Sequence, residues 1–239
     1  MSMEKKIDVD IRHMRIKYKR KEDAFTEDKL VSKEPIGQFK AWFEDACHHW
    51  KILEPNAMFV GTATRDGIPS IRPVLLKHYS TEGFTFYTNY ESRKGQEIAE
   101  NPRVALTFYW EGIQRSIRIE GIAKKTSPEN SDSYFQSRPY ESRIGAIASK
   151  QSRVIPSRDF LIEKETALLA EYEDGPRPVK RPECWGGYLV VPHSVEFWQG
   201  QSDRLHDRIR FRRPEANERI DNMFVHEGED GWVYERLSP

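Results

Sequence analysis

The chain has 239 residues, and its 38 lysines and arginines are balanced by 38 aspartates and glutamates. A net charge of zero excludes the general basic surface that nucleic-acid binding favours, and no apolar run is long enough to predict a transmembrane helix. Residues 1–33 mix charges with few periodic apolar positions. They are predicted to form a mobile arm, open to ordering against a partner subunit.

A helix is predicted over residues 34–50, because Ile36, Phe39 and Trp42 recur at helical spacing. Short strands follow it, and Arg65-Asp66-Gly67 is typical of a hairpin turn between the first two. These strands are predicted at 57–64, 70–77, 83–88, 104–110 and 116–124. Short strands joined by tight turns indicate an antiparallel sheet or barrel.

Helices interrupt and follow this sheet. Ser92 is a plausible N-cap for a helix at 92–100, which Asn101-Pro102 would end. Further helices are predicted at 131–137, 142–149 and 157–172, then a proline-rich connector at 175–182, then strands at 184–191, 194–199, 208–212 and 232–237. Because the late strands would complete the early sheet, we predict one domain over residues 34–239, mainly β with inserted helices (α+β).

The two cysteines, Cys47 and Cys184, form no CxxC pair, which disfavours a zinc ribbon or a redox dithiol. Their scarcity and the polar N-terminus, which lacks a secretory signal, predict a cytoplasmic protein. Cys47, His48 and His49 are consecutive, so on a helix their side chains diverge instead of meeting at one ion. No metal site is predicted.

Residues 87–94 lead from a predicted strand into a helix that starts with Arg93 and Lys94. Free backbone N–H groups at a helix start, with adjacent cations, favour phosphate binding. Arginine grips phosphate through parallel hydrogen bonds, and lysine adds a compact charge. The glycine pattern of a Walker loop is missing. The alternative is a solvated helix start.

A second anion site is suggested by Tyr134, Arg138 and Ser142, which together with Lys77 could surround a phosphate. Helical spacing would place Tyr134 and Arg138 on one face. Strand alternation would put Arg72 and Lys77 on opposite faces, where they could serve two different anions. The alternatives are unrelated surface charges and a cation–π pair on a helix.

The run from Trp198 to Arg208 (WQGQSDRLHDR) places an aromatic ring, two arginines and a histidine between two predicted strands. Guanidinium groups need anionic or hydrogen-bonding partners once they are desolvated. The run therefore favours a ligand site, and the alternative is a solvated hairpin loop.

Taken together, these motifs resemble the pyridoxamine 5'-phosphate oxidase family. The resemblance covers roughly residues 35–239, and its segments are 72–77, 86–94 (FYTNYESRK), 108–111 (FYWE), 134–139, 144–152, 185–188 (WGGY), 196–208 and 234–239 (YERLSP). It implies an FMN-binding split β-barrel that works as a homodimer with two sites at the subunit interface. It implies oxidation of pyridoxamine or pyridoxine 5'-phosphate to pyridoxal 5'-phosphate, with O2 reduced to H2O2.

The resemblance also implies site residues. The FMN contacts would be Arg72, Pro73, Val74, Leu75, Tyr87, Thr88, Arg93, Lys94, Ser116, Gln151, Ser152, Trp198 and Arg208. The substrate would contact Lys77, Tyr134, Arg138, Ser142, Arg204, Leu205 and His206, with Arg204 and His206 catalytic over its ring. Two positions depart from the pattern: Ser116 stands where the family usually has glutamine, and Pro73 where methionine is more usual.

Two other functions compete with this oxidase hypothesis. A split-barrel module could bind flavin as a sensor or carrier without turnover, but it would lack the substrate set described above. A nucleic-acid binder could use the arginine-rich strand at 208–213, but zero net charge disfavours it. Neither nucleic acid nor a membrane is expected as a partner.

Overall fold

The computed structural model describes residues 10–14, 18, 23–173 and 178–239. In these residues the dominant feature is an antiparallel sheet. Its strands are β1 (Ala57–Ala63), β2 (Pro69–Leu75), β3 (His78–Ser80), β4 (Gly83–Asn89), β5 (Arg103–Trp110), β6 (Arg115–Lys125), β7 (Trp185–Gln199), β8 (Asp207–Arg212), β9 (His226–Glu227) and β10 (Val233–Arg236).

The strand order is β2-β1-β5-β6-β7-β8-β10-β9, with β4 paired to β7 and β3 paired to β4. The path starts at β2 and stops at β9, so hydrogen bonds do not close the sheet into a complete barrel. The predicted fold class, mainly β with inserted helices, is confirmed. Between the predicted strands, the short β3 was missed.

The long strand β7 changes partners along one edge. Residues 185–190 pair with β4 and residues 194–199 pair with β8, while β6 pairs with residues 188–199 along the opposite edge. The sequence predicted two strands here, split near Pro192. One strand forms instead, because the register shifts between Glu120 and Gly121 and leaves His193 as an extra residue. A Cβ at Gly121 would lie 2.4 Å from the Val191 carbonyl oxygen, so glycine is required.

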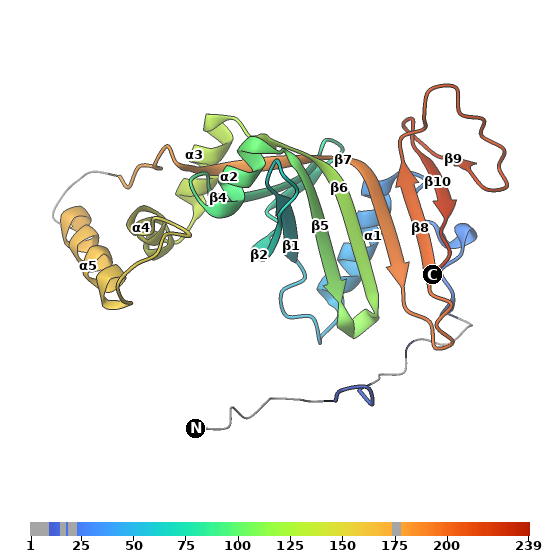
Figure 1. Cartoon of the computed structure of the whole chain (residues 1–239), viewed down its shortest axis with the longest axis horizontal. Helices are drawn as coiled ribbons and strands as arrows, with labels where there is room; N and C mark the ends of the chain where they lie inside the picture. The colour runs from blue at the N-terminus through green and yellow to red at the C-terminus, as the bar shows by residue number, and fades with distance from the viewer. Residues whose placement is uncertain (1–9, 15–17, 19–22, 174–177) are drawn as a thin grey trace, which may run out of the picture.

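Five helices complete the described fold. They are α1 (Pro35–His48), α2 (Arg93–Glu100), α3 (Pro128–Ser137), α4 (Tyr140–Ala148) and α5 (Asp159–Glu173). Helix α1 lies behind the sheet in Figure 1 and covers its apolar face. Phe39 packs 4.9 Å from Phe84 and 5.3 Å from Phe108, and Trp42 packs 5.2 Å from Phe197, between ring centroids. Burying each such ring contributes about 2 kcal/mol.

A smaller core holds the helices at one end of the molecule. It contains Phe135, Ile144, Val179 and Trp185, and residues of α5 pack against it. Figure 1 shows α4 and α5 at the end opposite β8, β9 and β10. The predicted connector at 175–182 lies partly outside the described residues.

The predicted arm is only partly described, since residues 1–9, 15–17 and 19–22 lie outside the described part of the chain. Residues 23–33 pack against the sheet, unlike a mobile arm. Phe25 is 4% exposed, its ring lies 4.8 Å from the Trp42 ring in a tilted arrangement, and its backbone N–H donates to Asp207 Oδ2 at 2.8 Å. A single buried phenylalanine gives no periodic pattern in the sequence, so this packing was not predicted.

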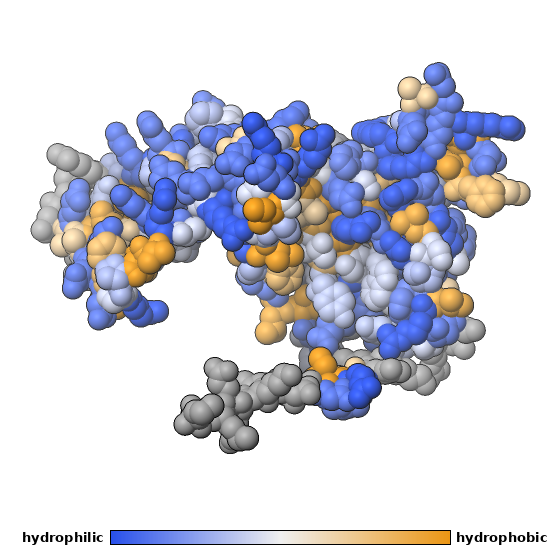
Figure 2. Space-filling view, in the orientation of Figure 1, coloured by the Kyte–Doolittle hydropathy of each residue, from blue (hydrophilic) through white to orange (hydrophobic). Residues whose placement is uncertain are grey.

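Apolar side chains gather on the surface over the β1–β2 end of the sheet (Figure 2). Phe59, Ile68 and Ile71 are 46%, 59% and 69% exposed there. An apolar patch of this kind on a sheet face is typical of a contact surface. Among the described helices, none combines the length and apolar character needed to cross a membrane.

Candidate functional site

The start of α2 is built to hold an anion. Ser92 caps the helix, and its hydroxyl accepts the Gly95 backbone N–H at 3.3 Å, as the sequence predicted. Arg93 and Lys94 occupy the first turn. The remaining N–H groups and these cations favour negative charge at this end of the helix.

Lys94 is buried without a carboxylate partner among the described residues. Its Nζ donates to Gln151 Oε1 at 2.9 Å and to Thr88 Oγ1 at 3.2 Å. Burial, and then the positive charge of Arg72, lower the pKa of Lys94 to about 8. A nearby anion would reverse this shift, because it would stabilise the charged amine.

A buried carboxylate organises the neighbouring arginines. Glu97 accepts a hydrogen bond from Arg93 Nε at 2.8 Å and lies 3.4 Å from Arg72 Nη2. Burial alone would raise the pKa of Glu97, but hydrogen bonds from Ser70, Thr62 and Arg93 outweigh it and hold this pKa at about 2. Glu97 was not among the predicted site residues, although its spacing of four residues from Arg93 was a usable signal.

Charge at this site is unbalanced. Arg72, Arg93 and Lys94 are three cations around the single carboxylate of Glu97. Two positive charges therefore remain uncompensated, which matches the charge of about −2 on a phosphate monoester.

A fourth cation lies just beyond the end of α3. Arg138 is the C-cap residue, so it lies outside the helix and the expected shared helical face with Tyr134 is wrong. The guanidinium lies 4.8 Å from the Trp185 ring centre, and its Nη1 is buried with no hydrogen-bond partner among the described groups. Burial lowers the pKa of Arg138. A cavity of about 300 Å³ adjoins Arg138, Ser142, Gln151 and Trp185.

Two other predicted substrate residues lie outside this cavity. The Tyr134 ring is not part of the cavity lining and stacks on the Tyr87 ring, with centroids 3.9 Å apart. Lys77 is exposed just after β2 and borders a different hollow, with Leu76 and Tyr79. Within one chain, Lys77 is therefore not brought to Arg138. It also follows the end of β2, so the predicted strand alternation between Arg72 and Lys77 does not apply.

The remaining predicted contacts on this side lie on β2 and after α4. Pro73 is exposed on β2, an edge strand where a missing N–H is tolerated, and Val74 and Leu75 are half-buried beside it. Ser152 has a left-handed φ of 70°. Such a conformation in a residue other than glycine is often found at functional sites. We call this region, containing Arg72, Tyr87, Thr88, Arg93, Lys94, Tyr134, Arg138, Ser142, Gln151 and Ser152, the helix-side half-site.

The other predicted residues lie where β7 ends and where β6 and β8 begin. Ser116 pairs with Trp198, and Trp198 pairs with Arg208, in one row across the three strands. The Ser116 hydroxyl donates to the Phe108 carbonyl at 2.8 Å. Arg208 Nε donates to Glu196 at 2.7 Å, and this bond raises the pKa of Arg208.

The turn between β7 and β8 carries the remaining residues. Arg204 has a left-handed φ of 70° and Leu205 is exposed. The His206 ring lies 4.9 Å from the Trp198 ring, and its Nδ1 accepts the Gln201 backbone N–H at 3.0 Å. Burial, and then the charge of Arg204, lower the pKa of His206. We call Ser116, Trp198, Arg204, Leu205, His206 and Arg208 the turn-side half-site.

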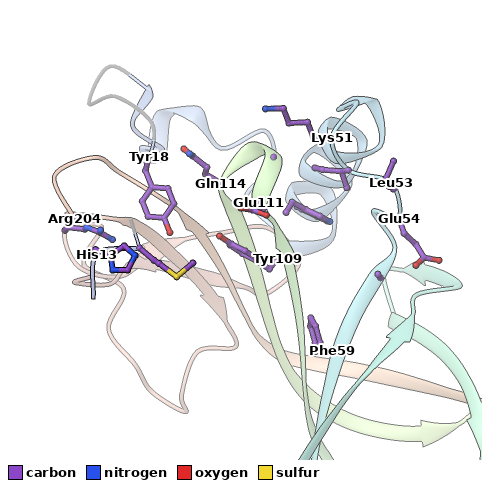
Figure 3. Close-up of a pocket in the computed structure, with 15 residues that line it drawn as sticks. His13, Tyr18, Lys51, Leu53, Glu54, Phe59, Tyr109, Glu111, Gln114 and Arg204 are labelled. Atoms are coloured by element: carbon purple, nitrogen blue, oxygen red, sulfur yellow. The ribbon is translucent and has the colours of Figure 1, made fainter. Parts of the chain in front are cut away.

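A cleft of about 1100 Å³ opens beside this turn (Figure 3). Tyr18 and Arg204 border it, and the Arg204 guanidinium lies 5.6 Å from the Tyr18 ring centre. Tyr18 also meets Trp198 and His206 edge-on, at 6.0 and 5.8 Å. Tyr18 was not among the predicted site residues, because the sequence around it has no periodic pattern.

The two half-sites lie far apart within one chain. Thr88 pairs with Gly186 near one end of β7, and Ser116 pairs with Trp198 near the other. Those two positions of β7 are twelve residues apart, or ~40 Å in an extended strand. One small ligand cannot contact both half-sites of the same chain.

Comparison with known proteins identifies relatives along nearly the whole chain. The family model described as pyridoxamine 5'-phosphate oxidase matches residues 43–165. The model described as the pyridoxine 5'-phosphate oxidase C-terminal dimerisation region matches residues 185–239. Together they include both half-sites.

Named relatives agree with these matches. A pyridoxine/pyridoxamine 5'-phosphate oxidase of Bombyx mori is 58% identical, over 97% of this chain and 90% of the relative. A pyridoxine-5'-phosphate oxidase of Bos taurus is 48% identical, over 97% of this chain and 88% of the relative. The crystal structure of PhzG from Burkholderia lata 383, in complex with tetrahydrophenazine-1-carboxylic acid, superposes with a TM-score of 0.76 at 29% identity, covering 91% of this chain and 98% of PhzG.

Proposed function

The chain belongs to the pyridoxamine 5'-phosphate oxidase family, and on that premise we propose that it oxidises pyridoxamine 5'-phosphate or pyridoxine 5'-phosphate to pyridoxal 5'-phosphate, with O2 as acceptor and H2O2 as product. The observation that carries this proposal is the 58% identity to an oxidase of that name over 97% of the chain. The cations at the start of α2 and the cavity beside Arg138 add physical support, since both a flavin nucleotide and the substrate would bring a phosphate.

The flavin proposed is FMN, and the helix-side half-site fits its phosphate. The fit rests on the buried Lys94, with its pKa of about 8, and on the excess positive charge around Glu97. Arg72, Arg93 and Lys94 would hold the phosphate. The further contacts proposed on this side are Val74, Leu75, Tyr87, Thr88, Gln151 and Ser152. Bound FMN would supply a hydride acceptor that returns its electrons to O2.

The substrate phosphate fits the neighbouring cavity. Arg138 has a buried guanidinium nitrogen without a hydrogen-bond partner among the described groups, which an anion would satisfy. Ser142 lines the same cavity and would add a hydroxyl donor. Tyr134 and Lys77, which lie outside the cavity within one chain, are proposed as further contacts of the phosphate. Holding the phosphate away from the reacting carbon gives binding energy that orients the substrate.

The second half of each site would come from another copy of the chain. The half-sites are ~40 Å apart along β7, so a homodimer that sets one against the other completes two sites by symmetry. The exposed Phe59, Ile68 and Ile71 and the match to a dimerisation region support this arrangement. Ser116, Trp198 and Arg208 of the partner subunit would contact the flavin, and the partner subunit's Arg204, Leu205 and His206 the substrate ring.

Heterodimers of two inactive variants test this proposal. Lys94→Ala disables the helix-side half-site and His206→Ala the turn-side half-site, so each homodimer should lose most peroxide formation with pyridoxamine 5'-phosphate. A heterodimer, isolated with two different affinity tags, should contain one intact site and recover about half of the wild-type rate per dimer. If each site lay within one chain, the heterodimer would contain no intact site and would stay inactive.

The purified wild-type protein supplies the control. It should be yellow, should release FMN on denaturation, and should form H2O2 with either substrate. A protein that binds FMN tightly but forms no peroxide with either substrate would contradict the oxidase and favour a flavin-binding module.

A further inference from the structure

The two ring nitrogens of His206 have different surroundings. Nδ1 faces the turn and accepts the backbone N–H of Gln201 at 3.0 Å. A backbone N–H can only donate, so Nδ1 must offer its lone pair. A neutral imidazole with a lone pair on Nδ1 carries its hydrogen on Nε2. The turn therefore fixes one tautomer of this ring.

We propose that His206 acts on the substrate as a neutral hydrogen-bond donor through Nε2–H, and that Gln201 is the positioning residue that fixes this tautomer. The inference rests on the proposed oxidase function and specifies the part of His206 in it. Among the described residues, no group hydrogen-bonds to Nε2. That nitrogen is consequently available to an acceptor atom of the bound substrate. A base at the same position would instead need a lone pair on Nε2.

Gln201 is itself firmly held. It is 3% exposed, and its side-chain amide donates to Asp207 Oδ2 at 2.6 Å. Asp207 also accepts the Phe25 backbone N–H and lies 3.0 Å from Arg236 Nη1. These bonds anchor the turn to β10 and to the segment before α1, so the Gln201 N–H keeps its direction.

On balance, the surroundings of His206 oppose protonation of the ring. Arg204, Asp203 and Asp207 face it from its own turn, and Tyr18 and Trp198 contribute rings from other segments. Protonation of Nδ1 would set a new N–H against the Gln201 N–H and break their hydrogen bond. Burial and Arg204 lower the pKa of His206 from its ordinary 6.5, against the two carboxylates. The neutral donor therefore persists below pH 6.5, and turnover should fall only at more acidic pH.

Nitrogen NMR reads the tautomer without depending on catalysis. The full-length protein labelled with 15N-histidine contains seven histidines, and the His206 signals are assigned as those lost in His206→Gln. We expect one-bond coupling to hydrogen at Nε2 and an unprotonated Nδ1 at pH 7. A hydrogen on Nδ1 at this pH would overturn the proposal, even if the protein proved to be an active oxidase.

Two substitutions separate a donor from a titrating group. His206→Gln places an amide NH2 near the position of Nε2, whereas His206→Ala removes the donor. We expect His206→Gln to keep kcat/KM within about tenfold of wild type and to lose the acidic fall in rate, and His206→Ala to lose about 100-fold. FMN affinity is measured in both variants to establish that the site is intact. Equal losses in Gln and Ala would show that proton transfer is required and would overturn the proposal.

Discussion

The two half-sites both depend on arginine, yet they hold their cations in opposite electrostatic states. On the helix side, burial lowers the pKa of Lys94 to about 8 and also lowers that of Arg138. On the turn side, the pKa of Arg208 is raised because Glu196 already accepts its hydrogen bond. On the helix side the cations outnumber the described carboxylate Glu97, whereas on the turn side Glu196 already pairs with Arg208. We infer that the first binds anions, and that the second orients rings.

Removing a cation from the helix side should have the largest effect. Lys94→Met is expected to weaken FMN binding about 100-fold, because a charged hydrogen bond to phosphate contributes ~2–3 kcal/mol. Riboflavin, which has no phosphate, should bind the variant as well as it binds wild type. Quenching of flavin fluorescence on addition of apoprotein measures both affinities.

The matched control is Lys124→Met, the same change at an exposed lysine of β6. It should leave both affinities unaltered. If Lys94→Met weakened the binding of riboflavin as much as that of FMN, the proposed electrostatic difference between the half-sites would be wrong.

Removing a cation from the turn side should affect the substrate instead. Arg204→Asn is expected to lower kcat/KM about 30-fold, the equivalent of ~2 kcal/mol, and to change FMN affinity less than twofold. Asparagine tolerates the left-handed backbone of residue 204, so the change tests the guanidinium and not the turn. Steady-state peroxide formation measures the rate, with the exposed Arg219→Asn as control. A loss of FMN affinity as large as the loss of kcat/KM would contradict the assignment of Arg204 to the substrate.

The lowered pKa of Lys94 gives FMN affinity an alkaline pH dependence, distinct from the acidic fall in turnover expected from His206 on the turn side. The free protein loses the Lys94 proton near pH 8, whereas bound phosphate would raise this pKa. Binding then takes up a proton above pH 8, so FMN affinity should fall with rising pH by up to tenfold per unit. Titrations between pH 7 and 10 test the slope. The same slope in Lys94→Met would assign it to another group.

The smallest effect is expected at Ser116. Ser116→Gln restores the residue usual in the family, and its amide could reach further than the hydroxyl, which now donates to the Phe108 carbonyl. We expect FMN affinity to rise about threefold, a gain below 1 kcal/mol. Ser116→Ala removes the same Phe108 bond without adding an amide and should leave the affinity near wild type. Weaker FMN binding in Ser116→Gln would place this position away from the flavin.

Local signals in the sequence predicted most elements of the fold. Ser92 caps α2 as expected, and the helix and strand limits agree within a few residues. The errors arose where tertiary structure overrides a local signal. Two strands were predicted at 184–191 and 194–199, but they form one strand because a register shift opposite Gly121 accommodates an extra residue. Arg138 was assigned to a helix face, but α3 ends one residue earlier.

The candidate site was predictable in its residue types but not in its spatial division. Arg93, Lys94, Arg204 and His206 carry chemistry that is visible in the sequence. Their separation depends on the pairing register of β7, which no local pattern specifies. The role of Glu97 as a buried partner of two arginines depends in the same way on how α2 packs against β1 and β2.

The register shift opposite Gly121 has a consequence for the proposed dimer as a whole. It lies between the part of β7 that contributes Trp185 to the cavity of one centre and the part that contributes Trp198 to the other. Deleting the extra residue, His193, would leave the pairing of both parts with β6 intact, but it would remove the local bend and added twist that a bulge gives a strand. The geometry of both centres of a pair would then change together, although no contact residue had been altered, because a single strand connects them.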